Sequence, residues 1–344
     1  MEIIDYIIVG IYLVGILIIG MWFERKASKS IDSFFLGDRS LKWWALGASG
    51  MASNIDVSGT MINVALIYAL GAQGYFVEIR GGIVLIMAFM MVFMGKWNRR
   101  AHVMTLAEWM QFRFGDSTQG RIARLVCAVA ILMSTIAITG YFAVGSGKFI
   151  GEFLDLPEIW GIKPDFVASV IMVSISLLYT AASGLYGVVW TDVIQGVLIL
   201  ISIFVVIYIS LTQYILPDSF IISTPAVDGG FISQTVTRES WTNIIPQWEL
   251  NFPSESKYAI YNLFGVSILF YLAKTVIEGS GGTGGYMIQR YYAARSDRDA
   301  GLLSLFWTVL LTFRWPFTAA VAIMAIVYGN TTGDIVKDPE LALP

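Results

Sequence analysis

The sequence predicts an all-α membrane protein, and three observations support this fold class. First, 56% of the 344 residues are hydrophobic and only 14% are charged, whereas soluble domains carry about 25% charged residues. Second, the mean hydropathy is +0.70. Third, the apolar residues fall into eight segments of the length that crosses a bilayer as a helix, ~20 residues: 3–23, 42–69, 75–97, 121–150, 165–183, 186–215, 258–285 and 301–328.

Composition excludes several other classes of protein. The single cysteine, Cys127, allows no intrachain disulfide, and the single histidine, His102, has no second His or Cys nearby for a metal site. A net charge of −3 without a basic face argues against nucleic acid as a partner. The sequence shows no nucleophile–base pair, and GSGGTGG is not followed by the Lys-Ser or Lys-Thr of a phosphate-binding loop. We therefore expect neither an enzyme nor an organic cofactor.

The distribution of Lys and Arg predicts how the chain is oriented in the cell membrane. The segments 24–42, 96–124 and 290–298 hold 14 of the 22 basic residues, which places them in the cytoplasm by the positive-inside rule. The N-terminus is then extracytoplasmic. It begins MEIIDYIIVG, with acids where a signal peptide carries positive charge, so the first segment is expected to be retained. The polar stretch 216–257 is extracytoplasmic, and its TRESWTNIIPQWEL is either a short amphipathic helix or lid or an irregular loop.

Two of the apolar segments are interrupted by polar residues. In MASNIDVSGT (51–60), Asn54, Asp56 and Ser58 lie within the second segment, although an aspartate at the centre of a spanning helix costs ~3 kcal/mol on insertion scales. In IEGSGGTGGY (277–286), glycines surround Glu278 and Ser280 and favour unwinding. Small residues also serve tight helix packing. Paired interruptions, however, indicate the binding site of a secondary transporter, where freed carbonyls hold a cation and helix N-termini hold an anionic group.

Other charged residues within the apolar segments have more than one reading. Lys274 and Glu278 are four residues apart and either pair with each other on one helix face or contact a substrate. Arg314, in LTFRWPF, lies inside the last segment, where Pro316 would disturb the helix. Its guanidinium would clamp a carboxylate, which suggests an organic-acid or amino-acid substrate, or would neutralise Asp56 or Glu78.

Four segments resemble the sodium:solute symporter family, which includes the sodium–sugar and sodium–proline symporters. They are FFLGDRSLKWWALGASGMASNI (34–55), TLAEWMQFRFG (105–115), SGLYGVVWTDVIQG (183–196) and YMIQRYYAARS (286–296), and they occur in the family's order. The resemblance implies a LeuT-type inverted-repeat fold in a single transmembrane domain, 1–344. An extra helix over 1–23 would precede a first five-helix repeat over 42–215, and 258–328 would start the second repeat. It also implies import of a small solute with Na⁺ as coupling ion, by alternating access.

The resemblance also implies roles for particular residues. The family's main sodium site uses backbone carbonyls at positions that match Ala52 and Ile55. Asp192 matches an acid associated with the cytoplasmic sodium route, although it could instead be an interfacial residue at a helix start. Glu78 falls where sugar-transporting relatives have a substrate-binding acid. The chain departs from these relatives at other sugar contacts: Gly59 replaces a Gln, and Ile277 and Ser280 replace an Asn and a gating Tyr. The solute is thus expected to be an organic acid, an amino acid or sugar-like.

The end of the sequence suggests that these residues are a fragment of a longer protein. The chain stops at DIVKDPELALP, before the eighth core helix that completes the sodium site in the resembled family. Eight transmembrane helices would then be an incomplete fold, truncated after the seventh core helix. Two alternatives remain open at this point: a symporter-like membrane domain of a signalling protein, and a channel-like half-unit that dimerises.

Overall fold

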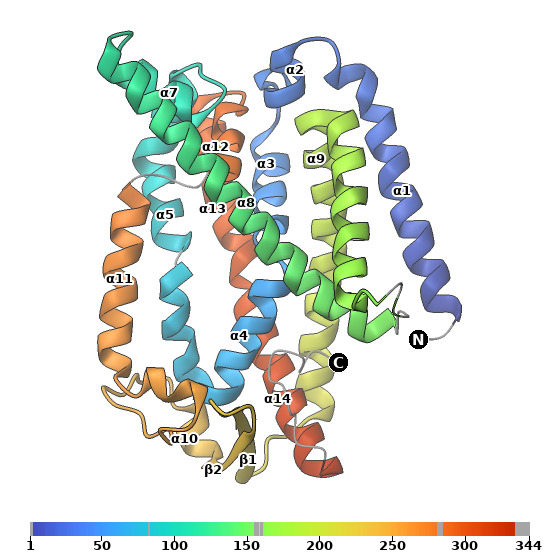
Figure 1. The fold of residues 1–344 in the computed structure, drawn as a ribbon, viewed down its shortest axis with the longest axis vertical. Coiled ribbons are helices and arrows are strands. Elements are labelled where there is room, and N and C mark those ends of the chain that lie inside the picture. Colours follow the sequence, from blue (N-terminus) through green and yellow to red (C-terminus); the bar gives the residue numbers. More distant parts are fainter. Residues whose placement is uncertain (1–2, 82, 155–157, 159–160, 281–284, 334–344) are drawn as a thin grey trace. The chain divides into compact units, whose positions relative to one another are not determined.

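The computed structural model describes residues 3–81, 83–154, 158, 161–280 and 285–333; the side chains of 78–81, 83–85, 152–154, 277–280, 285 and 286 lie outside the description. The chain is mostly helical (Figure 1). The first half contains α1 (Ile3–Ala27), α2 (Ile31–Leu36), η1 (Gly37–Arg39), α3 (Trp43–Ala52), α4 (Val57–Leu70), η2 (Gly71–Gly81), α5 (Ile83–Phe89), η3 (Met90–Met94), α6 (Gly95–Arg100), α7 (Leu106–Phe114) and α8 (Thr118–Leu154). The second half contains α9 (Pro164–Gln213), β1 (Ser219–Pro225), β2 (Phe231–Thr237), α10 (Arg238–Thr242), η4 (Lys257–Tyr261), α11 (Phe264–Ser280), α12 (Gly285–Tyr292), α13 (Asp297–Thr312) and α14 (Arg314–Thr332).

Five helical stretches among the described residues are long and apolar enough to cross a membrane: Ile3–Ala27, Val57–Val77, Thr118–Gly151, Pro164–Gln213 and Asp297–Thr332. The 50 residues of α9 are enough for two crossings, and the backbone leaves helical geometry at Gly184, between the two predicted segments. The predicted segments 42–69, 75–97 and 258–285 are present as shorter helices. The all-α expectation therefore holds for the apolar segments.

The apolar surface of the helices fits a lipid environment. On α8, none of the most apolar window is buried, and side chains such as Leu132 and Ile136 are more than half exposed. On α1, Ile11 and Trp22 are likewise exposed. Large contiguous apolar surfaces of this kind are uncommon on soluble monomers. Their most direct explanation is contact with hydrocarbon chains.

The predicted interruption of the second apolar segment is present. Helix α3 ends at Ala52 and α4 begins at Val57, so residues 53–56 are non-helical. The second predicted interruption coincides with the end of α11 at Ser280 and the start of α12 at Gly285; residues 281–284 lie outside the described part of the chain. The last segment is also divided, because α13 ends at Thr312 and α14 begins at Arg314.

The chain forms two compact units, each assembled from three stretches of sequence. The first unit comprises residues 1–58, 87–197 and 282–310, and the second comprises 59–86, 198–281 and 311–344. In the first unit, Gly50 of α3 lies against the buried ring of Trp307, and a Cβ atom at this position would come within 2.3 Å of the ring. A glycine here therefore allows α3 and α13 to approach closely.

The second unit contains an element that the sequence analysis did not predict. Residues 216–257, expected to be an irregular loop or a short amphipathic helix, include an antiparallel hairpin in which β1 pairs with β2. The short helix α10 follows it, and buried Trp241 packs its ring against Phe220 and donates from its indole nitrogen to the Tyr68 carbonyl at 3.2 Å. The hairpin reverses at Gly229, whose φ of 91° favours glycine.

Candidate functional site

The candidate site is built around the non-helical residues that follow α3. The end of α3 is closed by hydrogen bonds to its last carbonyls: Ser53 N donates to Ser49 O at 3.0 Å, and Ile55 N to Met51 O at 3.1 Å. Side chains add to these bonds, because Ser53 Oγ donates to Ser49 O at 2.8 Å and Asn54 Nδ2 to Gly50 O at 3.0 Å. Asn54, predicted to contact substrate, thus uses one of its amide donors to finish the helix.

The two carbonyls carried over from the family resemblance lie at this interruption. Ala52 is the last residue of α3, and Ile55 is in the non-helical segment. The Ala52 carbonyl is among the last carbonyls of α3, which no N–H of the same helix can reach, and the Ile55 carbonyl belongs to non-helical backbone. Both oxygens can therefore accept a hydrogen bond from another donor or bind a cation. In an apolar helix, backbone oxygens of this kind require such a partner.

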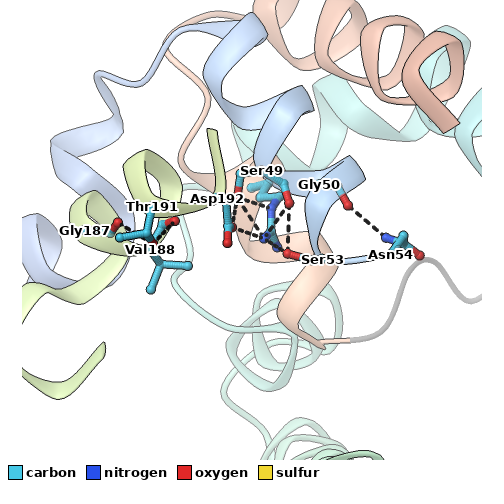
Figure 2. A network of polar contacts seen from close by, with 9 residues as sticks. Ser49, Gly50, Ser53, Asn54, Gly187, Val188, Thr191 and Asp192 are labelled. Carbon is cyan, nitrogen blue, oxygen red and sulfur yellow. Dashed lines mark hydrogen bonds and ion pairs between the residues drawn. The ribbon is translucent and has the colours of Figure 1, made fainter. Parts of the chain in front are cut away.

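A buried polar cluster joins the end of α3 to α9 and α12 within the first unit (Figure 2). Asp192 of α9 accepts a 2.5 Å hydrogen bond from Ser49 Oγ, and its Oδ2 atom is 3.3 Å from Nη2 of Arg290. Arg290 donates from Nη2 to Ser53 Oγ at 2.6 Å, and from Nε to Ser49 Oγ at 3.0 Å. We call Ser49, Ser53, Asp192 and Arg290 the polar cluster.

Burial makes the charges of the polar cluster depend on each other. Asp192 is 8% exposed, Arg290 4% and Ser49 0%. Isolated charges at this depth would cost several kcal/mol each, so the carboxylate and the guanidinium must neutralise one another. The guanidinium also lies 5.9 Å from the centre of the Trp307 ring, a distance at which the ring face attracts a cation.

The structure corrects one sequence interpretation of Asp192 and adds a residue that the sequence analysis did not single out. Asp192 lies in the interior of α9 and is buried, so it is not an interfacial residue at a helix start. Arg290 had been counted with the cytoplasmic basic residues, yet it is buried beside Asp192. A signal was present, because Arg290 is the only charged residue in GYMIQRYY and Asp192 is the only one in VVWTDVIQ.

The other predicted residues near the interruption are placed as follows. Asp56 directly precedes α4 and is half-buried. At the N-terminus of a helix, its carboxylate is stabilised by the helix dipole, which lowers the cost of an acid in an apolar segment. Ser58 is buried in the first turn of α4 and donates to the Tyr141 carbonyl of α8 at 3.3 Å. A Cβ atom at Gly145 of α8 would overlap the Ser58 hydroxyl, so the two helices pack tightly here.

The remaining predicted residues belong to the second unit. Glu78 is in η2, and Glu278 and Ser280 are in α11, but their side chains lie outside the described residues. Their proposed contacts, including the pairing of Lys274 with Glu278, stay predictions. Arg314 belongs to the second unit, where it is the half-buried first residue of α14.

Comparison with known proteins identifies the family. The model of the sodium:solute symporter family matches residues 34–337. The chain belongs to this family. Its members are transporters, so the prediction that this protein is not an enzyme is confirmed by its relatives.

Individual relatives agree with the family assignment. The chain is 31% identical over 219 residues to sodium/glucose cotransporter 4 of Danio rerio, an alignment that covers 61% of this chain and 30% of the relative. It is 26% identical over 344 residues to the sodium/glucose cotransporter of Vibrio parahaemolyticus, with 98% and 56% covered.

A solved structure shows the fold. The Na⁺-coupled sialic acid symporter, in a substrate-bound outward-open state, superposes with a TM-score of 0.71 at 17% identity, over 100% of this chain and 65% of that chain. The predicted LeuT-type fold is confirmed by this similarity. In each comparison, the chain spans less than two thirds of the relative's length.

Proposed function

We propose that the chain is part of a sodium-coupled secondary active transporter, which imports a small organic solute across the cell membrane by alternating access. The observation that carries the proposal is the interruption of an apolar helix at residues 53–56, between the end of α3 and the start of α4. Family membership supports the same function.

The interruption would hold the coupling ion and the solute with opposite helix ends. The C-terminal end of α3 carries partial negative charge and would attract Na⁺ to the carbonyls of Ala52 and Ile55, with Asp56 and Asp192 as nearby acids. The N-terminal end of α4 carries partial positive charge and would attract an anionic group of a solute. Two carbonyls are few ligands for a hard cation, so other oxygens of the protein would complete the site.

The solute class that we favour is an organic acid or an amino acid. Candidate contacts beside the interruption are Asn54 and Ser58. The other candidates are proposed from the sequence alone: Glu78, Glu278, Ser280 and Arg314. We also propose that the N-terminus is extracytoplasmic, because of the 14 basic residues that the positive-inside rule assigns to the cytoplasm.

The proposed function is tested by replacing Asp56 in the full-length protein. Radiolabelled carboxylates, amino acids and sugars would be screened for uptake into proteoliposomes with an inward gradient of Na⁺ or, as reference, K⁺. We expect Na⁺-stimulated uptake of at least one solute, and its loss in Asp56→Ala. Asp228→Ala, an exposed acid in the hairpin turn, is the matched control and should transport normally. Sodium stimulation that is the same in Asp56→Ala and wild type would exclude Asp56 from the mechanism.

A further inference from the structure

A single nitrogen atom of Arg290 is surrounded by four oxygen atoms of the polar cluster. Nη2 lies 2.6 Å from Ser53 Oγ and 2.9 Å from Ser49 Oγ. It lies 3.3 Å from the Ser49 carbonyl oxygen and 3.3 Å from Asp192 Oδ2. A guanidinium nitrogen of this kind has two hydrogens to donate, so four oxygens exceed what its hydrogen bonding requires. The arrangement resembles the coordination of a small cation by hard oxygen ligands.

The hydrogen bonds of the cluster direct oxygen lone pairs at that nitrogen. The Ser49 hydroxyl donates its hydrogen to Asp192, and the Ser53 hydroxyl donates its hydrogen to the Ser49 carbonyl. Each hydroxyl hydrogen therefore has an acceptor within the cluster, and each hydroxyl presents only lone pairs to Nη2. A position surrounded by lone pairs and one carboxylate is electrostatically negative, whatever cation occupies it.

From this geometry, we propose that Ser49, Ser53 and Asp192 form a site for a monovalent cation in which Arg290 and Na⁺ compete. The inference rests on the proposed function, since it assigns a regulator to the coupling ion. In the arrangement described, the guanidinium occupies the site and keeps sodium out. When Arg290 withdraws, the two hydroxyl oxygens and Asp192 Oδ2 are left for a sodium ion, while the Ser49 carbonyl keeps its bonds from Ser53 N and Ser53 Oγ.

Charge balance makes the competition exclusive. Asp192 supplies one negative charge within a buried cluster, which one positive charge neutralises. A second cation in the same buried space would be uncompensated and would cost several kcal/mol. An empty site would instead leave the carboxylate uncompensated. The cluster therefore holds one cation at a time, either Arg290 or a free ion.

The position of the site relates it to the interruption of the α3–α4 helix. Ser53 is adjacent to Ala52, whose carbonyl is a proposed sodium ligand, and Ser49 lies one turn earlier on α3. A sodium ion that left the carbonyls of Ala52 and Ile55 would thus meet the polar cluster within one helical turn. The ion could bind there only when Arg290 has left the site.

The test measures sodium binding without any solute. The full-length protein in detergent is titrated with ²²Na⁺ as wild type, as Arg290→Gln and as Arg290→Met, two neutral replacements of similar length. We expect the half-saturating Na⁺ concentration to fall about tenfold or more in the neutral variants. This is the gain when an internal competitor that occupies a site nine-tenths of the time is removed. Should Arg290→Gln fail to fold, Arg290→Met, which suits an apolar interior, gives the same reading.

Two further variants test whether the change in Na⁺ affinity comes from the charge at position 290 or from a structural effect of the substitution. Arg290→Lys keeps a cation that can compete, so its sodium affinity should stay near wild type. Adding Asp192→Asn to Arg290→Met should abolish the gain, because the carboxylate of the site is lost. Unchanged or weaker sodium binding in both neutral variants would overturn the proposal. If the wild type shows no sodium-dependent uptake, the proposed function fails, whereas a tenfold shift in ²²Na⁺ affinity would still support the cation site.

Discussion

Replacing Gly184 by alanine should destabilise the first unit strongly. Gly184 divides α9 with φ 54° and ψ −155°, a region that is essentially restricted to glycine and costs about 1–3 kcal/mol for other residues. A Cβ atom there would lie 2.5 Å from the Phe34 carbonyl oxygen, a backbone atom that cannot rotate away. Relieving such an overlap costs about another 1–3 kcal/mol. The two terms together predict a loss of about 2–6 kcal/mol in the free energy of unfolding.

The assay is equilibrium unfolding of the purified protein in mixed micelles, with Gly140→Ala as the matched control. Gly140 lies within α8, and a Cβ atom there would meet nothing within 4 Å. Alanine at Gly140 should therefore be neutral or stabilising by up to about 1 kcal/mol, because alanine is the better helix former. If Gly184→Ala and Gly140→Ala unfold with the same free energy, the reasoning about the α9 break is wrong. Asp192 follows Gly184 on α9, so the position of its carboxylate in the polar cluster depends on the backbone conformation at this glycine.

Two further predictions concern the charges of the protein. Asp192→Asn leaves the buried Arg290 without its carboxylate, so it should lower the free energy of unfolding by about 3–5 kcal/mol. Adding Arg290→Met should recover part of this loss in the same assay. A double variant that is no more stable than Asp192→Asn would contradict the pairing. In intact cells, and with the native cysteine replaced, a membrane-impermeant thiol reagent should label Asp228→Cys but not Ser28→Cys; the reverse pattern would invert the proposed orientation.

The sequence predicts the helical framework well, because the length of an apolar segment indicates a membrane-spanning helix and polar or glycine residues within it indicate a break. The sequence shows the interruption at 53–56 as polar residues within an apolar run. It shows the α9 division as two apolar segments that meet near Gly184. The hairpin of β1 and β2 was not predicted, because 216–257 was interpreted as a short amphipathic helix or an irregular loop. The dipeptide of Asp228 and Gly229, flanked by β-branched residues, was the available signal.

The polar cluster was predicted only in part, for a physical reason. Positive-inside counting treats an arginine near the end of an apolar segment as an interfacial charge, and Arg290 meets that criterion by position. Its burial depends on contacts with Asp192 and Ser49, which lie 98 and 241 residues away in the chain. Such pairing is set by the tertiary fold and has no local pattern. The motif resemblance supplied Asp192, while the partner required the structure.

The length of α8 has a consequence for the membrane itself. The helical stretch Thr118–Gly151 contains 34 residues, which extend about 51 Å at 1.5 Å per residue, and it carries Arg121, Arg124 and Lys148 toward its ends. A hydrocarbon core is only about 30 Å thick. The helix must therefore lie inclined, or carry its charged ends beyond the hydrocarbon, or thicken the lipid around it. Each of these responses costs energy that depends on acyl-chain length. Bilayer thickness is thus a variable that acts on the same unit that contains the polar cluster.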